Sequence, residues 1–166
     1  VAWQAVNSAS TLDFTPCAPN TVTTKLQGAL LLAASVARAS TGVMPIVKHI
    51  PGHGRARVDS HKALPVVDTA AAELEATDFK PFQALADAPW AMTAHVVYSA
   101  LDPERPATTS ATVIDAVIRG QIGFQGLLLS DDLSMEALKG GLGQRAEASL
   151  GAGCDVALHC NGKAGE

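Results

Sequence analysis

Short apolar runs alternate with segments of helical periodicity along the chain. Apolar runs of strand length occur at residues 12–17, 43–47, 90–97, 127–130 and 156–159. Segments with helical character separate them, at residues 21–40, 78–87, 110–120 and 143–151. Within the third of these helices, Ser110 suits the N-cap and Gly120 the C′ position. Because right-handed crossovers place helices on the faces of a parallel sheet, this alternation predicts the α/β class.

Polar residues gather at the ends of these predicted strands. They are Lys48 and His49, Asp131 and Asp132, and His159, while Thr93 and His95 lie within another predicted strand. Functional groups at the C-terminal ends of parallel strands are typical of a (β/α)8 barrel, whose active site forms there. Such a barrel needs about 250 residues, whereas this chain has 166 and shows about five strands. We therefore expect one partial barrel domain over residues 1–166, with its N-terminal strands missing.

Composition excludes several classes of protein. The net charge is −4, the sequence pI is near 5.7, and the lysines and arginines are scattered, so nucleic acid is not an expected partner. The apolar run at residues 28–37 is about half of the roughly 20 residues that cross a bilayer, so we expect a buried helix and no membrane span. No secretory signal is visible, which makes the cytoplasm the expected location. Cys154 and Cys160 are expected to be buried free thiols.

A dense group of ionisable residues follows the second apolar run, in Lys48-His49-Ile50-Pro51-Gly52-His53-Gly54 and Asp59-Ser60-His61. Imidazole and carboxylate ligands suit zinc, but no His-x-x-x-His pair falls on a helix, so no metal is expected. The residues could also be solvated loop side chains. Acid/base chemistry is favoured, because a carboxylate at Asp59 would fix the tautomer of His61 and raise its basicity.

The segment Leu127-Leu128-Leu129-Ser130-Asp131-Asp132 delivers two carboxylates at the end of a buried strand. Successive side chains of a strand point opposite ways, so only one of the two faces a given site and the other is structural. An N-cap role for such a pair is the alternative. A carboxylate nucleophile with a proton donor is what retaining glycoside hydrolysis requires. The usual donor is a second carboxylic acid, which a histidine held by Asp59 could replace.

Two separate motifs carry a resemblance to a known family. Residues 48–54, with Asp59-Ser60-His61 and Leu64-Pro65, closely resemble the signature of bacterial β-N-acetylglucosaminidases of glycoside hydrolase family 3. Residues 117–119 and 126–135 resemble the nucleophile motif of the same family. The resemblance extends over residues 42–166 and includes Met92-Thr93-Ala94-His95 and Ala152-Gly153-Cys154-Asp155-Val156.

The resemblance implies a (β/α)8 barrel that removes terminal β-linked N-acetylglucosamine from peptidoglycan fragments during cell-wall recycling in the cytoplasm, without a cofactor. It also implies residue roles. Asp131 matches the nucleophile, His61 the acid/base and Asp59 the residue that orients His61. Lys48 and His49 match positions that hold sugar hydroxyls, for which a lysine is a suitable donor.

The N-terminal part departs from the family pattern. Residues 1–41 fit poorly, and no position matches the arginine and the aspartate with which the family grips the sugar. An incomplete barrel would expose sheet edges, which predicts weak stability or self-association. One alternative function is therefore a catalytically silent barrel remnant that binds sugar or another subunit. In another, phosphate replaces water as the acceptor, since a neutral histidine does not repel an anion.

Overall fold

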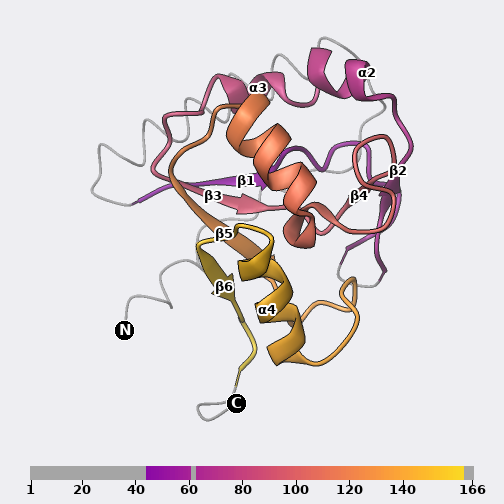
Figure 1. Cartoon of the computed structure of the whole chain (residues 1–166), viewed down its shortest axis with the longest axis vertical. Helices are drawn as coiled ribbons and strands as arrows, with labels where there is room; N and C mark the ends of the chain where they lie inside the picture. Colours follow the sequence, from indigo (N-terminus) through magenta and orange to yellow (C-terminus); the bar gives the residue numbers. More distant parts are fainter. Residues whose placement is uncertain (1–43, 61–62, 163–166) are drawn as a thin grey trace.

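The protein is described by a computed structural model over residues 44–60 and 63–162. Four parallel strands form its main sheet, in the order β1-β3-β5-β6. They are β1 (Ile46–Ile50), β3 (Trp90–Thr93), β5 (Leu127–Asp132) and β6 (Val156–Leu158). The sheet twists from β1 to β6 in Figure 1. A parallel sheet of the α/β class is thus confirmed, whereas the predicted strand 12–17 and helix 21–40 lie outside the described residues.

The strand ends differ from the predicted ones. β1 lies three residues later than the predicted strand and contains Lys48 and His49, and β5 continues through Asp131 and Asp132. The parallel backbone pairing of Lys48 with Met92 and of Asp132 with Leu158 carries both strands past their apolar residues. The C-terminal parts of these two strands therefore carry Lys48, His49, Asp131 and Asp132, which the sequence pattern placed after the strands.

The strand predicted at residues 90–97 is confirmed only for residues 90–93, because the chain leaves the main sheet after Thr93. Residues 94–96 turn through the interior with His95 fully buried. A two-residue strand, β4 (Val97–Tyr98), then pairs with β2 (Val66–Val67) in a separate small sheet. Thr93 and His95 are therefore at the point where the chain passes between the two sheets.

Helices connect the strands, and η3 and α4 lie in front of the main sheet in Figure 1. The helices are α2 (Ala71–Ala76), α3 (Lys80–Gln83), η2 (Ala107–Thr109), η3 (Val113–Gln121) and α4 (Leu142–Gly151). The helix predicted at 143–151 is confirmed, while α3 is only a short part of the one predicted at 78–87. None of the helices in the described part of the chain is long and apolar enough to span a membrane.

The helix η3 is wider than an α-helix, with π-type hydrogen bonding. Ser110 precedes it as predicted, and its Oγ accepts the N–H of Val113 at 3.1 Å. The predicted end at Gly120 is wrong, because the N–H of Ile122 still bonds the carbonyl of Val117 at 2.8 Å. The left-handed turn that follows is made by Gly123, with a φ of 81°, a conformation that suits glycine.

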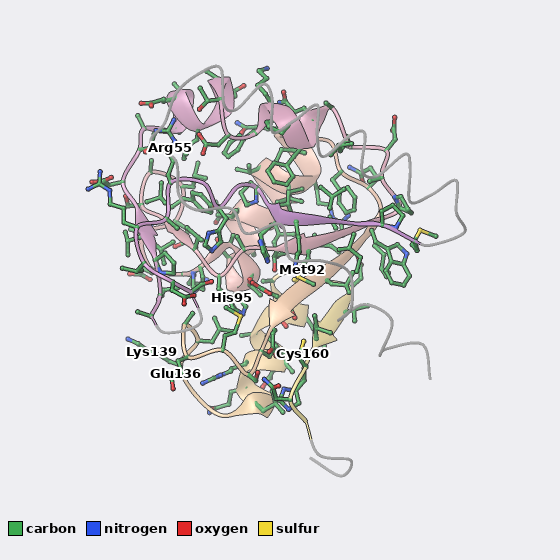
Figure 2. All side chains as sticks on the ribbon, turned by 180° about the vertical axis from the view of Figure 1, so that it is seen from behind. Arg55, Met92, His95, Glu136, Lys139 and Cys160 are labelled. Atoms are coloured by element: carbon green, nitrogen blue, oxygen red, sulfur yellow. The ribbon has the colours of Figure 1, made fainter. Side chains whose placement is uncertain are left out.

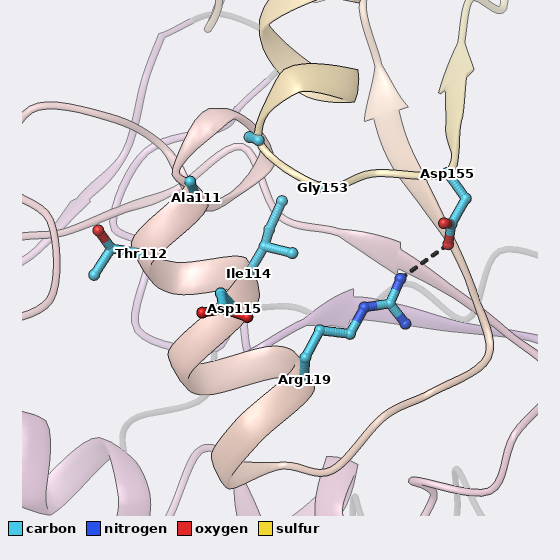
Figure 3. A pocket seen from close by; sticks show the side chains of 8 residues that line it. Ala111, Thr112, Ile114, Asp115, Arg119, Gly153 and Asp155 are labelled. Atoms are coloured by element: carbon cyan, nitrogen blue, oxygen red, sulfur yellow. Dashed lines mark hydrogen bonds and ion pairs between the residues drawn. The ribbon is translucent and has the colours of Figure 1, made fainter.

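An arginine joins η3 to the N-terminal ends of β5 and β6. Arg119 donates to the carbonyl oxygens of Phe124 (3.1 Å) and Gly126 (2.8 Å) and to Asp155 Oδ2 (2.9 Å). Figure 3 shows the Arg119–Asp155 contact beside a shallow hollow of about 640 Å³ between η3 and the α4–β6 turn. Asp155 also accepts the N–H of Leu128 at 2.8 Å. These contacts lie at the N-terminal end of β5, opposite Asp131. Since functional groups of such folds gather at the C-terminal strand ends, we assign these contacts a structural role.

Candidate active site

His49 on β1 and Asp131 on β5 meet at the C-terminal edge of the main sheet. The distance from His49 Nε2 to Asp131 Oδ2 is 3.6 Å, which is slightly longer than a hydrogen bond. Burial lowers the pKa of His49 to about 4, against the opposing charge of Asp131 and with help from Lys48, His53 and His95. The imidazole of His49 is therefore neutral near pH 7.

Asp131 is almost fully buried, and the backbone holds one side of its carboxylate. Its Oδ1 accepts the N–H of Asp132 at 2.9 Å, and its own N–H donates to Thr93 Oγ1 at 3.2 Å. Oδ2 is the oxygen that faces His49. A carboxylate fixed on one oxygen, with the other directed at the sheet edge, is placed to act as a nucleophile.

Asp132 points away from Asp131, as the alternation of a strand requires. Its oxygens accept the N–H of Ser134 (2.9 Å), the Oγ–H of Ser134 (2.6 Å) and the N–H of Cys160 (3.1 Å). Burial acts to raise the pKa of Asp132, but these hydrogen bonds and His159 lower it overall. The carboxylate of Asp132 thus fastens the turns that follow β5 and β6, which fits the structural role predicted for one of the pair.

The histidine loop, residues 51–60, begins directly after β1 and is fastened at several points. The ring centroids of His49 and His53 are 5.5 Å apart, and His53 Nε2 is 3.3 Å from Ser60 Oγ. Arg55 binds Asp78 Oδ2 (2.8 Å) in an ion pair that ties the loop to the segment after α2. The Tyr98 hydroxyl donates to the carbonyl of Gly52. The loop is therefore packed against both α2 and β4.

The remaining predicted site residues are only partly placed. Lys48 is exposed at the end of β1, and the Lys48–His49 and Ile50–Pro51 peptide bonds are both cis. Asp59 is exposed near the end of the histidine loop. His61 lies outside the described residues, so the Asp59–His61 pair stays a prediction.

The sequence pattern places His95 among the polar residues of the predicted strands without a role in the site, and the structure buries it beside Asp132. Its Nδ1 is 2.8 Å from Thr108 Oγ1, and its Nε2 is 3.0 Å from the carbonyl oxygen of Asp132. His95 and Met92 lie near the centre of the molecule in Figure 2, with Cys160 below them. The available signal was a histidine and a threonine in the middle of an apolar run, which polar partners must satisfy when buried.

Two other expectations concern thiols and metals. Cys154 is buried as predicted, but the prediction for Cys160 is wrong, because β6 ends at Leu158 and Cys160 is exposed on the chain that leaves the sheet. Within residues 44–60 and 63–162, no group of three or more histidine, cysteine or acidic side chains is arranged to hold a metal ion.

Comparisons with known proteins identify relatives of this chain. Residues 18–165 match the Glycosyl hydrolase family 3 N terminal domain. A beta-hexosaminidase from Tolumonas auensis is 46% identical over 129 residues, which are 75% of this chain and 38% of that protein. The structure of NagZ from Neisseria gonorrhoeae in complex with N-trifluoroacetyl-D-glucosamine aligns with a TM-score of 0.72 at 40% identity, covering 81% of this chain and 39% of NagZ.

A family 3 beta-N-acetylglucosaminidase from Paenibacillus sp. str. FPU-7 aligns with a TM-score of 0.78 at 36% identity, covering 81% of this chain and 27% of that one. The chain thus spans less than half the length of each of these relatives. The family match covers most of the chain. It includes both the motif of the histidine loop and the motif of β5. The chain therefore belongs to glycosyl hydrolase family 3, within the N-terminal domain of that family.

Proposed function

We propose that this chain is the catalytic part of a retaining β-N-acetylglucosaminidase built on a (β/α)8 barrel. The observation that carries the proposal is the placement of Asp131, a buried carboxylate at the C-terminal end of β5 whose Oδ2 is 3.6 Å from His49. Membership of glycosyl hydrolase family 3 supports the reaction class. The names of the relatives, beta-hexosaminidase and beta-N-acetylglucosaminidase, support the sugar.

In the proposed reaction, one oxygen of Asp131 attacks C1 of the terminal sugar and forms a covalent glycosyl-enzyme. The bond from C1 to the aglycone oxygen breaks, and His61 gives that oxygen its proton. A water molecule then attacks C1, His61 takes a proton from it, and the carboxylate of Asp131 is released. Asp59 orients His61, while Lys48 and His49 hold sugar hydroxyls.

The natural substrate in this proposal is a peptidoglycan fragment with terminal β-linked N-acetylglucosamine, which the protein would cleave in the cytoplasm. The bound N-trifluoroacetyl-D-glucosamine of the gonococcal NagZ supports an amino sugar at the site. Neither the aglycone nor the location follows from the geometry of the sheet edge, so both stay predictions, as does self-association through barrel edges.

The test is release of p-nitrophenol from its β-N-acetylglucosaminide by the full 166-residue chain, with Asp131→Ala beside it and circular dichroism as the check of folding. Release that disappears in Asp131→Ala supports the proposal. A folded chain without release would favour the silent barrel remnant. Repeating the assay with and without phosphate, and identifying the sugar product, separates hydrolysis from transfer to phosphate.

A further inference from the structure

A buried line of hydrogen-bonding side chains runs behind Asp131 and Asp132. It joins Thr93 at the end of β3, Thr108 in η2 and His95 in the turn after β3, all three fully buried. Thr93 Oγ1 and Thr108 Oγ1 are 2.8 Å apart, and Thr108 Oγ1 is 2.8 Å from His95 Nδ1. The line begins at the N–H of Asp131, which donates to Thr93 Oγ1. It ends at the carbonyl oxygen of Asp132, 3.0 Å from His95 Nε2.

The chemistry of the two ends gives this line a direction. A carbonyl oxygen only accepts, so Nε2 of His95 carries a proton and donates it to Asp132. Burial lowers the pKa of His95, which favours the neutral ring and leaves Nδ1 as an acceptor. Thr108 therefore donates to Nδ1, in a three-centre hydrogen bond whose second acceptor is the carbonyl oxygen of Ala94 at 3.1 Å. It accepts from Thr93, whose own oxygen accepts from the N–H of Asp131. Each hydroxyl donates once and accepts at least once along the line.

The line of hydrogen bonds thus holds the backbone N–H of Asp131 at one end and the backbone carbonyl of Asp132 at the other. Regular pairing with both neighbouring strands extends along β5 as far as Leu129, which pairs with Met92 of β3 and Val156 of β6. Beyond Leu129, Asp132 still pairs with Leu158 of β6, but the register between Leu129 and Asp132 is irregular. The backbone around Asp131 thus depends on side chains for part of its support. Because buried polar groups are costly unless satisfied, a completed line of this kind holds its members in one geometry.

We propose that Thr93, Thr108 and His95 are positioning residues that fix the backbone at Asp131 and so aim its carboxylate at the sugar carbon. This inference rests on the proposed function, in which Asp131 is the nucleophile. None of the three side chains needs to touch the substrate. Their removal should lower turnover, since small displacements of a reacting group cost rate, and should leave the binding of the sugar nearly intact.

The experiment compares Thr93→Val, which removes the hydroxyl and keeps the shape, with Thr93→Ser, which keeps the hydroxyl. Thr93→Val should lower kcat roughly 10- to 100-fold with KM within about twofold, and Thr93→Ser should recover most of the loss. The matched control is Ser149→Ala, because Ser149 is fully buried in α4 and bonds only locally, to the carbonyl of Ala146 at 3.0 Å. That variant should lower thermal stability without changing kcat.

The outcomes separate the two proposals. A wild-type chain without glycosidase activity, or activity that survives in Asp131→Ala, overturns the proposed function and the positioning role with it. An active wild type whose folded Thr93→Val variant keeps the kcat of Ser149→Ala overturns the positioning role alone. If Thr93→Val does not fold, the ¹⁵N NMR spectrum of wild-type His95 decides, because a ring protonated on Nδ1 rather than Nε2 contradicts the line.

Discussion

His49 Nε2 approaches Asp131 Oδ2 to 3.6 Å although the two residues stand on strands that do not pair with each other. β3 lies between β1 and β5, so the contact joins the two strands on either side of β3. The site is therefore a property of three neighbouring strands rather than of either motif alone.

Asp131→Ala should abolish glycosidase activity, whereas Asp132→Ala should mainly lower stability. The carboxylate of Asp132 accepts hydrogen bonds from the N–H and Oγ–H of Ser134 and from the N–H of Cys160. Hydrogen bonds to charged groups contribute about 1.5–3 kcal/mol, so a loss of this order is expected in urea unfolding. Release of p-nitrophenol by folded samples checks the activities. An equal loss of activity in a fully folded Asp132→Ala would overturn this division of roles.

Acid should destabilise the fold through His49. Its pKa is about 4 in the folded chain against 6.5 for an ordinary histidine. Between pH 6.5 and pH 4, His49 is protonated in the unfolded chain but neutral in the folded chain. The free energy of unfolding therefore falls as the pH is lowered through this range. Protonation of His49 in the unfolded chain should lower the free energy of unfolding by about 2 kcal/mol at pH 5 relative to pH 7.

Urea midpoints at pH 7 and pH 5, for wild type and His49→Gln, measure this effect. The variant should lose less stability than the wild type between the two pH values. Part of the pH dependence of stability should remain, because burial also lowers the pKa of His95. A proton NMR titration of the His49 ring gives an independent value. A midpoint near 6.5 would show that the ring is solvated, and the prediction would be wrong.

Arg55→Met should loosen the histidine loop. Arg55 binds Asp78 and Thr77 and pairs with Glu73 at 2.9 Å. Because Glu73 is exposed, we expect a loss of only about 1 kcal/mol. The specific result is faster amide hydrogen exchange over residues 51–60 than in the wild type. Arg57→Met, in the same loop but exposed, is the control. Equal exchange in the two variants would contradict the anchoring role of Arg55.

The sequence pattern predicted the parallel sheet and the opposite orientations of Asp131 and Asp132, because both follow from local periodicity. The strand ends were missed, since backbone pairing with β3 and β6 extends β1 and β5 beyond their apolar residues. β2 and β4 have two residues each, too few for any periodicity to be detected.

The support of the site was beyond sequence reasoning for a different reason. His95 is satisfied by Thr108 and by the carbonyl of Asp132, which lies 37 positions away along the chain. Arg55 likewise finds Asp78 across 23 positions. Pairings of this kind depend on which turns bring the strands and helices together, and no local pattern of apolar and polar residues encodes them.

The same glycine-to-alanine change should have opposite effects at Gly126 and Gly143. A Cβ at Gly126 would lie 2.5 Å from the carbonyl oxygen of Pro89 and 2.6 Å from that of Ala88. These backbone atoms cannot move without shifting the start of β5, so Gly126→Ala should cost about 1–3 kcal/mol. Gly143 is exposed within α4 with nothing within 4 Å of a Cβ, so Gly143→Ala should gain about 0.5–1 kcal/mol. Urea unfolding of both variants checks this, and a neutral Gly126→Ala would show that β5 starts farther from residues 88–89 than described.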